Sequence, residues 1–227
     1  MRLFESTSCG DSPVHRGQLI TVEGIDGSGK TTHIHHICTY LEEQNIPVVR
    51  TREPGGTEMG EALREILIRR VDLAMHAETE LLLLFSARME HLQKLISPAM
   101  ESGTWVVIDR FIDATYAYQG GGRGVSMDRI RFLENWVLNG LVPDLTLLLD
   151  LPVEISLART KARQQSTDRF ELQDQKFKNT VREAYLERAR QHPERIRIVD
   201  ASAETGCVKQ AILEILGSLV EREHGRA

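Results

Sequence analysis

The sequence predicts an α/β fold in which a five-stranded parallel sheet carries helices on both faces. Short runs of β-branched and aliphatic residues alternate with segments of helical periodicity, which is typical of βαβ units. Most of these runs are continuously apolar, as expected for strands covered on both faces. The expected strands are Leu19–Val22, Val48–Thr51, Thr104–Ile108, Leu145–Leu149 and Ile196–Val199. The result is a three-layer sandwich.

The helices are predicted from apolar residues that recur every three or four positions. The clearest stripes are Ile34, Ile37, Cys38 and Leu41 after the first strand, and Val208, Ile212, Ile215 and Leu219 near the end. A long helix is expected over Glu78–Met100, ended by Gly103. The polar, basic segment Thr160–Asp168 interrupts the helical pattern and predicts a small mobile lid over about residues 159–169.

Length and composition predict one domain. We expect a polar extension over residues 1–17, the domain over 18–222 and a short tail over 223–227, with neither a signal peptide nor an apolar run of the ~20 residues that cross a membrane. The net charge of −5 argues against a general nucleic-acid or membrane surface. Three widely spaced cysteines suggest neither a disulfide framework nor a zinc site, so the reducing cytoplasm is the expected compartment.

The strongest motif is GIDGSGKT, which fits the pattern G-x-x-x-x-G-K-[ST] between an apolar strand and an amphipathic helix. Its glycines let backbone N–H groups turn toward one anion, and the following helix adds the positive end of its dipole. Lys30 can then bridge the β- and γ-phosphates of ATP, and the Thr31 hydroxyl can ligate Mg²⁺. The expected ATP-binding residues are Gly24, Ile25, Asp26, Gly27, Ser28, Gly29, Lys30 and Thr31. A chance glycine-rich turn is the alternative, which the flanking strand and helix disfavour.

A second motif is the apolar strand that ends in Asp109-Arg110. Ligands of open α/β sheets gather at the carboxyl ends of strands, so this pair is expected beside the glycine-rich loop. Asp109 can hold magnesium through water, and Arg110 can grip a transferring phosphoryl group. A structural ion pair at the strand end is the alternative, and Asp150, at the end of another strand, is a rival metal-side carboxylate.

Two basic segments are further candidates. The lid segment carries Arg159, Lys161, Arg163 and Arg169. A mobile arginine that arrives on closure stabilises the charge of phosphoryl transfer, whereas a solvated helix face is the plainer alternative. In TREPGGT, directly after the second strand, a tight Gly-Gly turn places Arg52 to meet a second anion.

Two apparent signals are set aside. His33, His35 and His36 lie on the helix just behind the glycine-rich loop, and we expect a solvated surface there rather than a metal site. The aromatic residues are too sparse to form a stacking surface for single-stranded nucleic acid.

The ordered motifs EGIDGSGKTT, TREPGGT, LLLFSARMEH, a strand ending in DRF, ATYAYQGGGRG and DRFE closely resemble the thymidylate kinase family, from about residue 18 to 220. The resemblance implies a P-loop fold of the nucleoside-monophosphate-kinase type. It also implies transfer of the γ-phosphoryl group of ATP to dTMP with Mg²⁺, giving ADP and dTDP for dTTP biosynthesis. Family members are typically homodimers, and the helix Glu78–Met100 is expected to contribute to the interface.

The resemblance also implies roles for individual residues. Asp26 resembles the carboxylate that reaches toward the deoxyribose 3′-hydroxyl, and Arg110 the arginine that clamps acceptor and γ-phosphates. Phe85 resembles the ring that stacks on thymine, and Arg88 the arginine that bonds a thymine carbonyl. The residues expected along the nucleoside are Thr115, Tyr118 and Gln119, and those expected to act in catalysis are Asp26, Lys30, Arg110 and Arg163.

Glycine at position 27 indicates the bacterial type, in which the lid supplies the cation that other members carry in the loop. Arg163 is the first choice for that cation, with Arg159 and Arg169 as alternatives. The alternative functions are those of another P-loop nucleoside monophosphate kinase, a deoxynucleoside kinase or a regulatory P-loop ATPase. LLLFSAR and AYQGGGR favour the thymidylate acceptor, and the chain lacks the Asn-Lys-x-Asp motif of a GTPase switch.

Overall fold

The protein is built on a five-stranded, all-parallel sheet. The computed structural model describes residues 16–162, 169–170 and 173–225. Its strands are β1 (Leu19–Glu23), β2 (Val48–Arg52), β3 (Trp105–Asp109), β4 (Leu145–Asp150) and β5 (Ile196–Asp200), in the order β2-β3-β1-β4-β5. Neighbouring strands pair in parallel throughout. The five predicted strands are confirmed, each within one residue at its ends.

The connections between strands are helical. The α-helices are α1 (Lys30–Glu43), α2 (Glu58–Arg64), α3 (Ala77–His91), α4 (Ser97–Glu101), α5 (Ile112–Thr115), α6 (Met127–Leu138), α7 (Val153–Ala162), α8 (Gln175–Gln191) and α9 (Thr205–His224). π-Helical turns η1 (Glu65–Arg69), η2 (Leu92–Ile96) and η3 (Tyr116–Gly122) continue α2, α3 and α5. The predicted helix over Glu78–Met100 is confirmed as the continuous run of α3, η2 and α4. Of the predicted lid, α7 covers the beginning, and residues 163–168 lie outside the described part.

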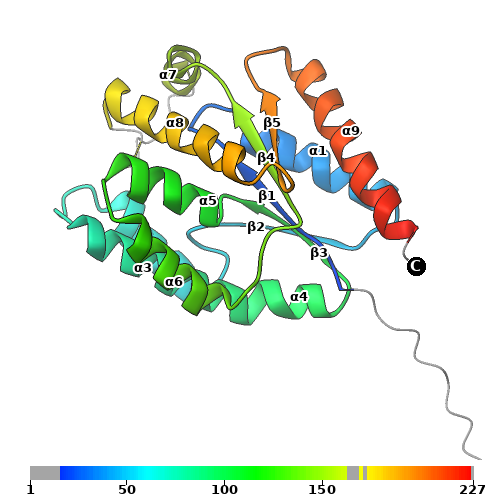
Figure 1. Ribbon diagram of the computed structural model, residues 1–227, viewed down its shortest axis with the longest axis horizontal. Helices are drawn as coiled ribbons and strands as arrows, with labels where there is room; N and C mark the ends of the chain where they lie inside the picture. The colour runs from blue at the N-terminus through cyan, green and yellow to red at the C-terminus, as the bar shows by residue number, and fades with distance from the viewer. Residues whose placement is uncertain (1–15, 163–168, 171–172, 226–227) are drawn as a thin grey trace, which may run out of the picture.

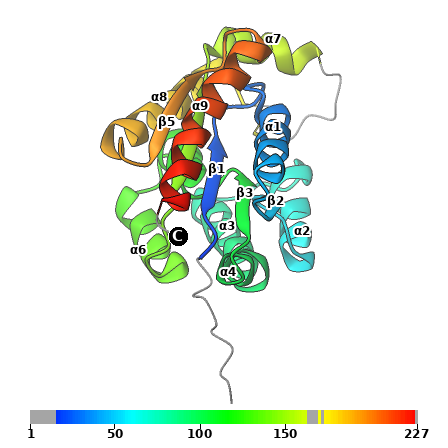
Figure 2. The same cartoon turned by 90° about the vertical axis from the view of Figure 1, so that its right-hand side faces the viewer.

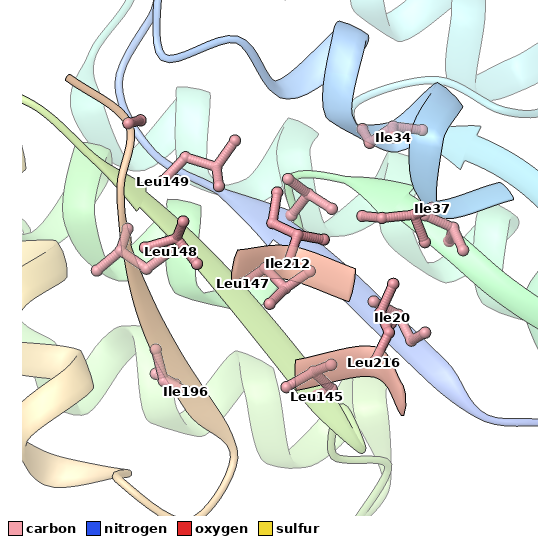
Figure 3. Close-up of a cluster of buried hydrophobic side chains, with 14 of the residues drawn as sticks. Ile20, Ile34, Ile37, Leu145, Leu147, Leu148, Leu149, Ile196, Ile212 and Leu216 are labelled. Atoms are coloured by element: carbon pink, nitrogen blue, oxygen red, sulfur yellow. The ribbon is translucent and has the colours of Figure 1, made fainter. Parts of the chain in front are cut away.

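The helices form layers on both faces of the sheet (Figures 1 and 2). Helices α1 and α9 pack together on one face, and α3, α4 and α6 lie on the other. On the first face, Ile20 of β1 and Leu147 of β4 meet Ile34 of α1 and Ile212 of α9 (Figure 3). Leu19, one residue before Ile20, joins the cluster on the opposite face, as the two-residue period of a strand requires. Both faces are thus apolar, which explains the continuously apolar strands.

The strand order determines where a ligand can bind. β1 lies between β3 and β4, and consecutive strands β1 and β2 are separated by β3. Such a switch in strand order leaves a crevice at the carboxyl ends of the strands. Val22 pairs with Asp109, so the loop after β1 and the Asp109-Arg110 pair after β3 emerge side by side. Within the described ranges, no helix is both long and apolar enough to cross a membrane.

Candidate active site

The loop from Gly24 to Lys30 has the backbone geometry of a phosphate cradle. Gly24, Gly27 and Gly29 have φ values of 133°, 77° and 89°, a region that side chains disfavour. A Cβ atom on Gly24 would lie 2.4 Å from the Leu149 carbonyl oxygen, so the turn also needs glycine for space. No side chain caps α1, which leaves the N–H groups of its first turn directed at the loop. The predicted anion site therefore has the required backbone.

Lys30 folds back into this loop. Its ammonium group donates to the Gly24 and Ile25 carbonyl oxygens at 3.0 and 3.1 Å. Burial and the nearby Arg110 lower the pKa of Lys30, while the carboxylates of Asp109 and Asp26 oppose that shift. Lys30 is thus a buried cation at the base of the cradle, positioned to exchange carbonyl partners for phosphate oxygens.

Arg110 and Asp26 form a direct ion pair. Arg110 Nη2 donates to Asp26 Oδ1 at 2.6 Å, and Nη1 donates to the Gly24 carbonyl oxygen at 2.8 Å. The guanidinium also lies 4.9 Å from the centroid of the Tyr118 ring. Although burial opposes its ionisation, the charges of Arg110 and Lys30 lower the pKa of Asp26. Both residues were predicted to act in catalysis, and they come from different segments, the loop after β1 and the end of β3. The structure brings them into direct contact.

A buried carboxyl group behind this pair was missed by the sequence analysis. Glu23, at the end of β1, accepts from the Phe111 backbone N–H at 2.7 Å and from the Tyr185 hydroxyl at 2.8 Å. Tyr185 in turn accepts from Arg110 Nη1 at 3.2 Å. Burial, with the charge of Asp113, raises the pKa of Glu23 to about 7. The sequence did contain one signal for this buried carboxyl group: Glu23 is a single acidic residue at the end of the otherwise apolar strand β1.

The candidate magnesium ligands face the same cavity. Asp109 and Thr31 both line it, and Asp109 Oδ1 is buried without a hydrogen-bond partner among the described residues. An orphaned carboxylate oxygen beside a phosphate cradle fits Mg²⁺, which is commonly held by one or two protein ligands together with substrate phosphates. Asp150, the rival candidate, instead bonds Arg182 through both oxygens at 2.7 and 2.8 Å.

Beyond the loop, the cavity continues to a second polar wall. Its volume is about 180 Å³. The sequence-predicted residues along its lining are Asp26, Gly27, Gly29, Lys30, Thr31, Arg52, Arg88, Asp109, Arg110, Thr115, Tyr118 and Gln119. Segments that follow three strands, β1, β2 and β3, therefore converge with helix α3 on one space.

Arg88 is the most constrained side chain of this second wall. Its Nε donates to Glu53 Oε2 at 2.7 Å, and its Nη2 donates to the Phe111 carbonyl and Thr115 Oγ1 at 3.1 and 3.0 Å. His91 Nδ1 lies 3.3 Å from the other Glu53 oxygen. Arg88 Nη1 is buried and has no partner among the described residues. A fixed guanidinium with one unused donor at a cavity is suited to a ligand carbonyl.

The predicted stacking ring is the main correction. Phe85 is only 2% exposed and packs in the core, where the Arg88 guanidinium lies 4.9 Å from its ring centroid. Leu84, one residue earlier, lines the cavity instead. Leu84 and Phe85 precede Arg88 by four and three residues, so both lie beside it on α3. They diverge by about 100° around the helix, and Phe85 is turned toward the core while Leu84 meets the cavity.

The remaining basic candidates occupy different places. Arg52 lines the cavity and is half exposed, bonded to Glu61 at 2.9 Å. Arg159 of α7 donates to the Ala201 carbonyl at 2.9 Å and lies 3.5 Å from that of Gly27, beside the loop. Arg169 donates to the Leu73 carbonyl at 2.8 Å, outside the cavity. Arg163 lies outside the described residues.

The histidine segment of α1 also differs from expectation. His33 is 4% exposed, with its ring 3.4 Å from the position that a Cβ atom on Gly29 would take. Burial, together with His36 and Arg159, lowers the pKa of His33 to about 4. The prediction of a solvated surface is therefore wrong for His33, which packs as a neutral ring behind the loop. Among the described residues no cluster of three metal-ligating side chains occurs.

Three features define the class of P-loop phosphotransferases: the glycine-rich loop after β1, the lysine and arginine side chains that contact it, and a second polar wall in the same cavity. A sequence model of thymidylate kinases matches residues 22–212. Thymidylate kinases of Nitrosomonas eutropha and Pseudomonas entomophila are 51% and 50% identical to this chain. The match to the Nitrosomonas eutropha protein covers 89% of this chain and 94% of that protein. The match to the Pseudomonas entomophila protein covers 92% of this chain and 99% of that protein.

A solved structure gives the same result. The thymidylate kinase from Ehrlichia chaffeensis superposes with a TM-score of 0.72 at 33% identity, covering 88% of this chain and 99% of that one. The chain belongs to the thymidylate kinase family.

Replacing Glu23 with glutamine is predicted to change the pH dependence of stability. The pKa of Glu23 is raised in the folded protein from 4.5 to about 7, so the folded state holds a proton that the unfolded state releases. The free energy of unfolding of the wild type therefore decreases as pH rises from 4.5 to about 7. The total decrease due to Glu23 is on the order of 3 kcal/mol. Glu23→Gln can still accept from the Phe111 N–H and can donate its NH₂ to the Tyr185 oxygen, and it has no ionisable group to lose stability with rising pH.

Urea unfolding of the wild type and variant at a series of pH values measures the effect. As pH rises, the free energy of unfolding of Glu23→Gln should increase relative to that of the wild type. The control Glu101→Gln, at the exposed end of α4, should show the same pH dependence as the wild type. A difference between Glu23→Gln and wild type that stays constant with pH would contradict the assignment.

Proposed function

We propose that the protein transfers the γ-phosphoryl group of ATP to dTMP, giving ADP and dTDP. The observation that carries this proposal is one cavity whose lining includes the phosphate cradle at Lys30 and, at its other end, the fixed Arg88 and Gln119. Membership of the thymidylate kinase family supports the choice of acceptor. Phosphoryl transfer depends chiefly on positioning and charge stabilisation, which are the properties this cavity supplies.

On the donor side, the loop N–H groups and Lys30 bind the β- and γ-phosphates of ATP. Asp109 and Thr31 are the residues that would hold Mg²⁺ together with those phosphates. When bound, Mg²⁺ neutralises charge on the phosphate oxygens. Arg159, beside Gly27, is positioned to follow the phosphates from the α7 side.

On the acceptor side, Arg110 is the link between the two nucleotides. It contacts the loop at Gly24 and pairs with Asp26, so its charge lies between the cradle and the rest of the cavity. A dTMP phosphate at Arg110 would therefore face the γ-phosphate across a short gap, with Arg52 as a second cation at the rim. Asp26 keeps Arg110 oriented, and the family resemblance assigns it to the sugar of the acceptor.

The base end of the cavity selects the pyrimidine. Arg88 Nη1 is the unused donor that would meet the O4 carbonyl of thymine. Leu84, Thr115 and Tyr118 surround that end and exclude water. Because Arg88 is held by Glu53 and Thr115, it cannot swing away when a base without the carbonyl enters, and the mismatch leaves buried donors unpaired.

The test is an ADP-release assay with ATP and Mg²⁺ that offers dTMP, dUMP, dCMP, dGMP and thymidine separately. We expect ADP with dTMP well above dCMP and dGMP, and none without an acceptor. Lys30→Ala should lower turnover by about a hundredfold or more, since it removes a cation from the transferring phosphates. Acceptor-independent hydrolysis, or preference for another substrate, would overturn the proposed function.

We further propose that the protein acts as a homodimer in the cytoplasm. Helix α6 exposes Phe132 and Trp136, both 67%, one helical turn apart. The adjacent helix α3 exposes Leu82 at 55% (Figure 1). An apolar surface of this kind on two packed helices is typical of an association site. The free thiols of Cys38 and Cys207 suit a reducing compartment.

Light scattering after gel filtration tests the dimer. The wild type should have twice the chain mass of 25.7 kDa. Trp136→Glu should shift it toward the monomer, because a charge buried at an interface is costly. Ile198→Glu, at an exposed site on edge strand β5, should not. A monomeric wild type would contradict the proposal.

A further inference from the structure

A buried acidic residue outside the cavity lining forms a hydrogen bond with a side chain that lines the cavity. Glu80, in the first turn of α3, is 2% exposed, and its Oε1 accepts from Gln119 Nε2 at 2.8 Å. Gln119 belongs to the π-helical turn η3 and lines the cavity, with 2% exposure of its own. The two residues are 39 positions apart in the chain, so the contact is a feature of the tertiary structure.

Arg123 forms an ion pair with Glu80 beside Gln119. Arg123 lies 3.4 Å from both carboxylate oxygens, through Nε to Oε1 and Nη2 to Oε2. Arg123 is itself held between Gln173, at 3.3 Å, and the ring of Phe177, 5.1 Å from its centroid. A carboxylate paired with a cation in this way only accepts hydrogen bonds.

This charge settles which end of the Gln119 amide faces the base. The two ends of an amide have nearly the same shape, and only the hydrogen-bond network distinguishes them. Because Glu80 requires a donor, Gln119 must turn its NH₂ toward Glu80 and its Oε1 the other way. No donor from the described residues reaches that oxygen, and the residue lines the cavity.

We propose that Glu80 is a positioning residue for pyrimidine specificity: by fixing the Gln119 amide, it presents an acceptor to the N3–H of the base. The inference rests on the proposed function and deepens it. Thymine and uracil carry N3–H beside O4, which matches an acceptor at Gln119 and a donor at Arg88. Cytosine carries an unprotonated N3 beside an amino group, so both partners would be mismatched.

The test is Glu80→Gln, with kcat and KM measured for dTMP and dCMP. A glutamine at this position has a single acceptor oxygen in place of the two that Gln119 and Arg123 share. With that oxygen on the Arg123 cation, its NH₂ faces Gln119, which flips and presents a donor to the base. We expect kcat/KM for dTMP to fall about tenfold or more and the dTMP-to-dCMP preference to fall with it, because a buried donor then opposes N3–H. KM for ATP should be unchanged. Glu78→Gln, on the same helical turn but exposed and paired with Arg129, should leave every value at the wild-type level.

The double variant Glu80→Gln/Gln119→Glu tests the orientation itself. It exchanges the two side-chain types, so residue 119 again accepts from the base while residue 80 donates to it. Recovery of most of the lost preference for dTMP is expected, whereas Gln119→Glu alone places two carboxylates together and should be impaired. A purely structural role for Glu80 would show no recovery in the double variant.

Three outcomes overturn the inference: a dTMP-to-dCMP preference that is unchanged in Glu80→Gln, equal losses for both substrates, or no recovery in the double variant. N3-methyl-dTMP tests the wild-type protein without any substitution, and binding as tight as that of dTMP would also overturn it. A wild type that does not prefer dTMP to dCMP overturns the proposed function, which separates that failure from failure of the role of Glu80.

Discussion

The arrangement of the site depends on the conformation of Arg110. This residue ends the turn after β3 with a φ of 66°, which a residue with a Cβ atom adopts at a cost of roughly 1 kcal/mol or more. Its backbone N–H donates to the Val22 carbonyl oxygen at 3.1 Å, and its guanidinium bonds Gly24, Asp26 and Tyr185. One side chain thereby ties β3 to the phosphate loop and to α8. These hydrogen bonds offset the free-energy cost of the unfavourable φ angle at Arg110.

Paired buried charges keep the rest of the cavity in place. Arg88 is matched by Glu53, and Glu80 is matched by Arg123, each pair joining elements that are distant in sequence. Removing either Arg88 or Glu53, both almost fully buried, leaves an uncompensated buried charge and costs about 3–5 kcal/mol. Donors and acceptors held in this way need little rearrangement when a ligand arrives, which is the property required of a site that acts by electrostatic positioning.

The sequence was sufficient for features that depend on neighbouring residues. The strands follow from apolar runs such as Leu145–Leu149, and the phosphate loop follows from a motif within eight residues. The position of Arg110 beside that loop followed from the rule that ligands gather at strand ends. These features are local or topological, so a single sequence contains the information for them.

Features that depend on tertiary contacts could not be predicted. Glu23, Glu53 and Glu80 are ordinary acidic residues in the sequence, and only the fold shows that each is buried against a particular partner. Phe85 was misplaced because one residue along a helix turns the side chain by about 100°, and the motif alone did not say which residue faces the cavity. His33 was misjudged because its burial is created by the loop that precedes its own helix.

The most direct test of this account is the turnover number of Arg110→Lys with ATP and dTMP, with the fold checked by thermal unfolding. Lysine keeps the charge but cannot bond Gly24, Asp26 and Tyr185 together. If Arg110 aligns donor and acceptor, kcat should fall about a hundredfold or more, while the protein remains folded. A kcat within about threefold of the wild-type value would contradict the account, because the charge alone, without that alignment, would then be sufficient for transfer.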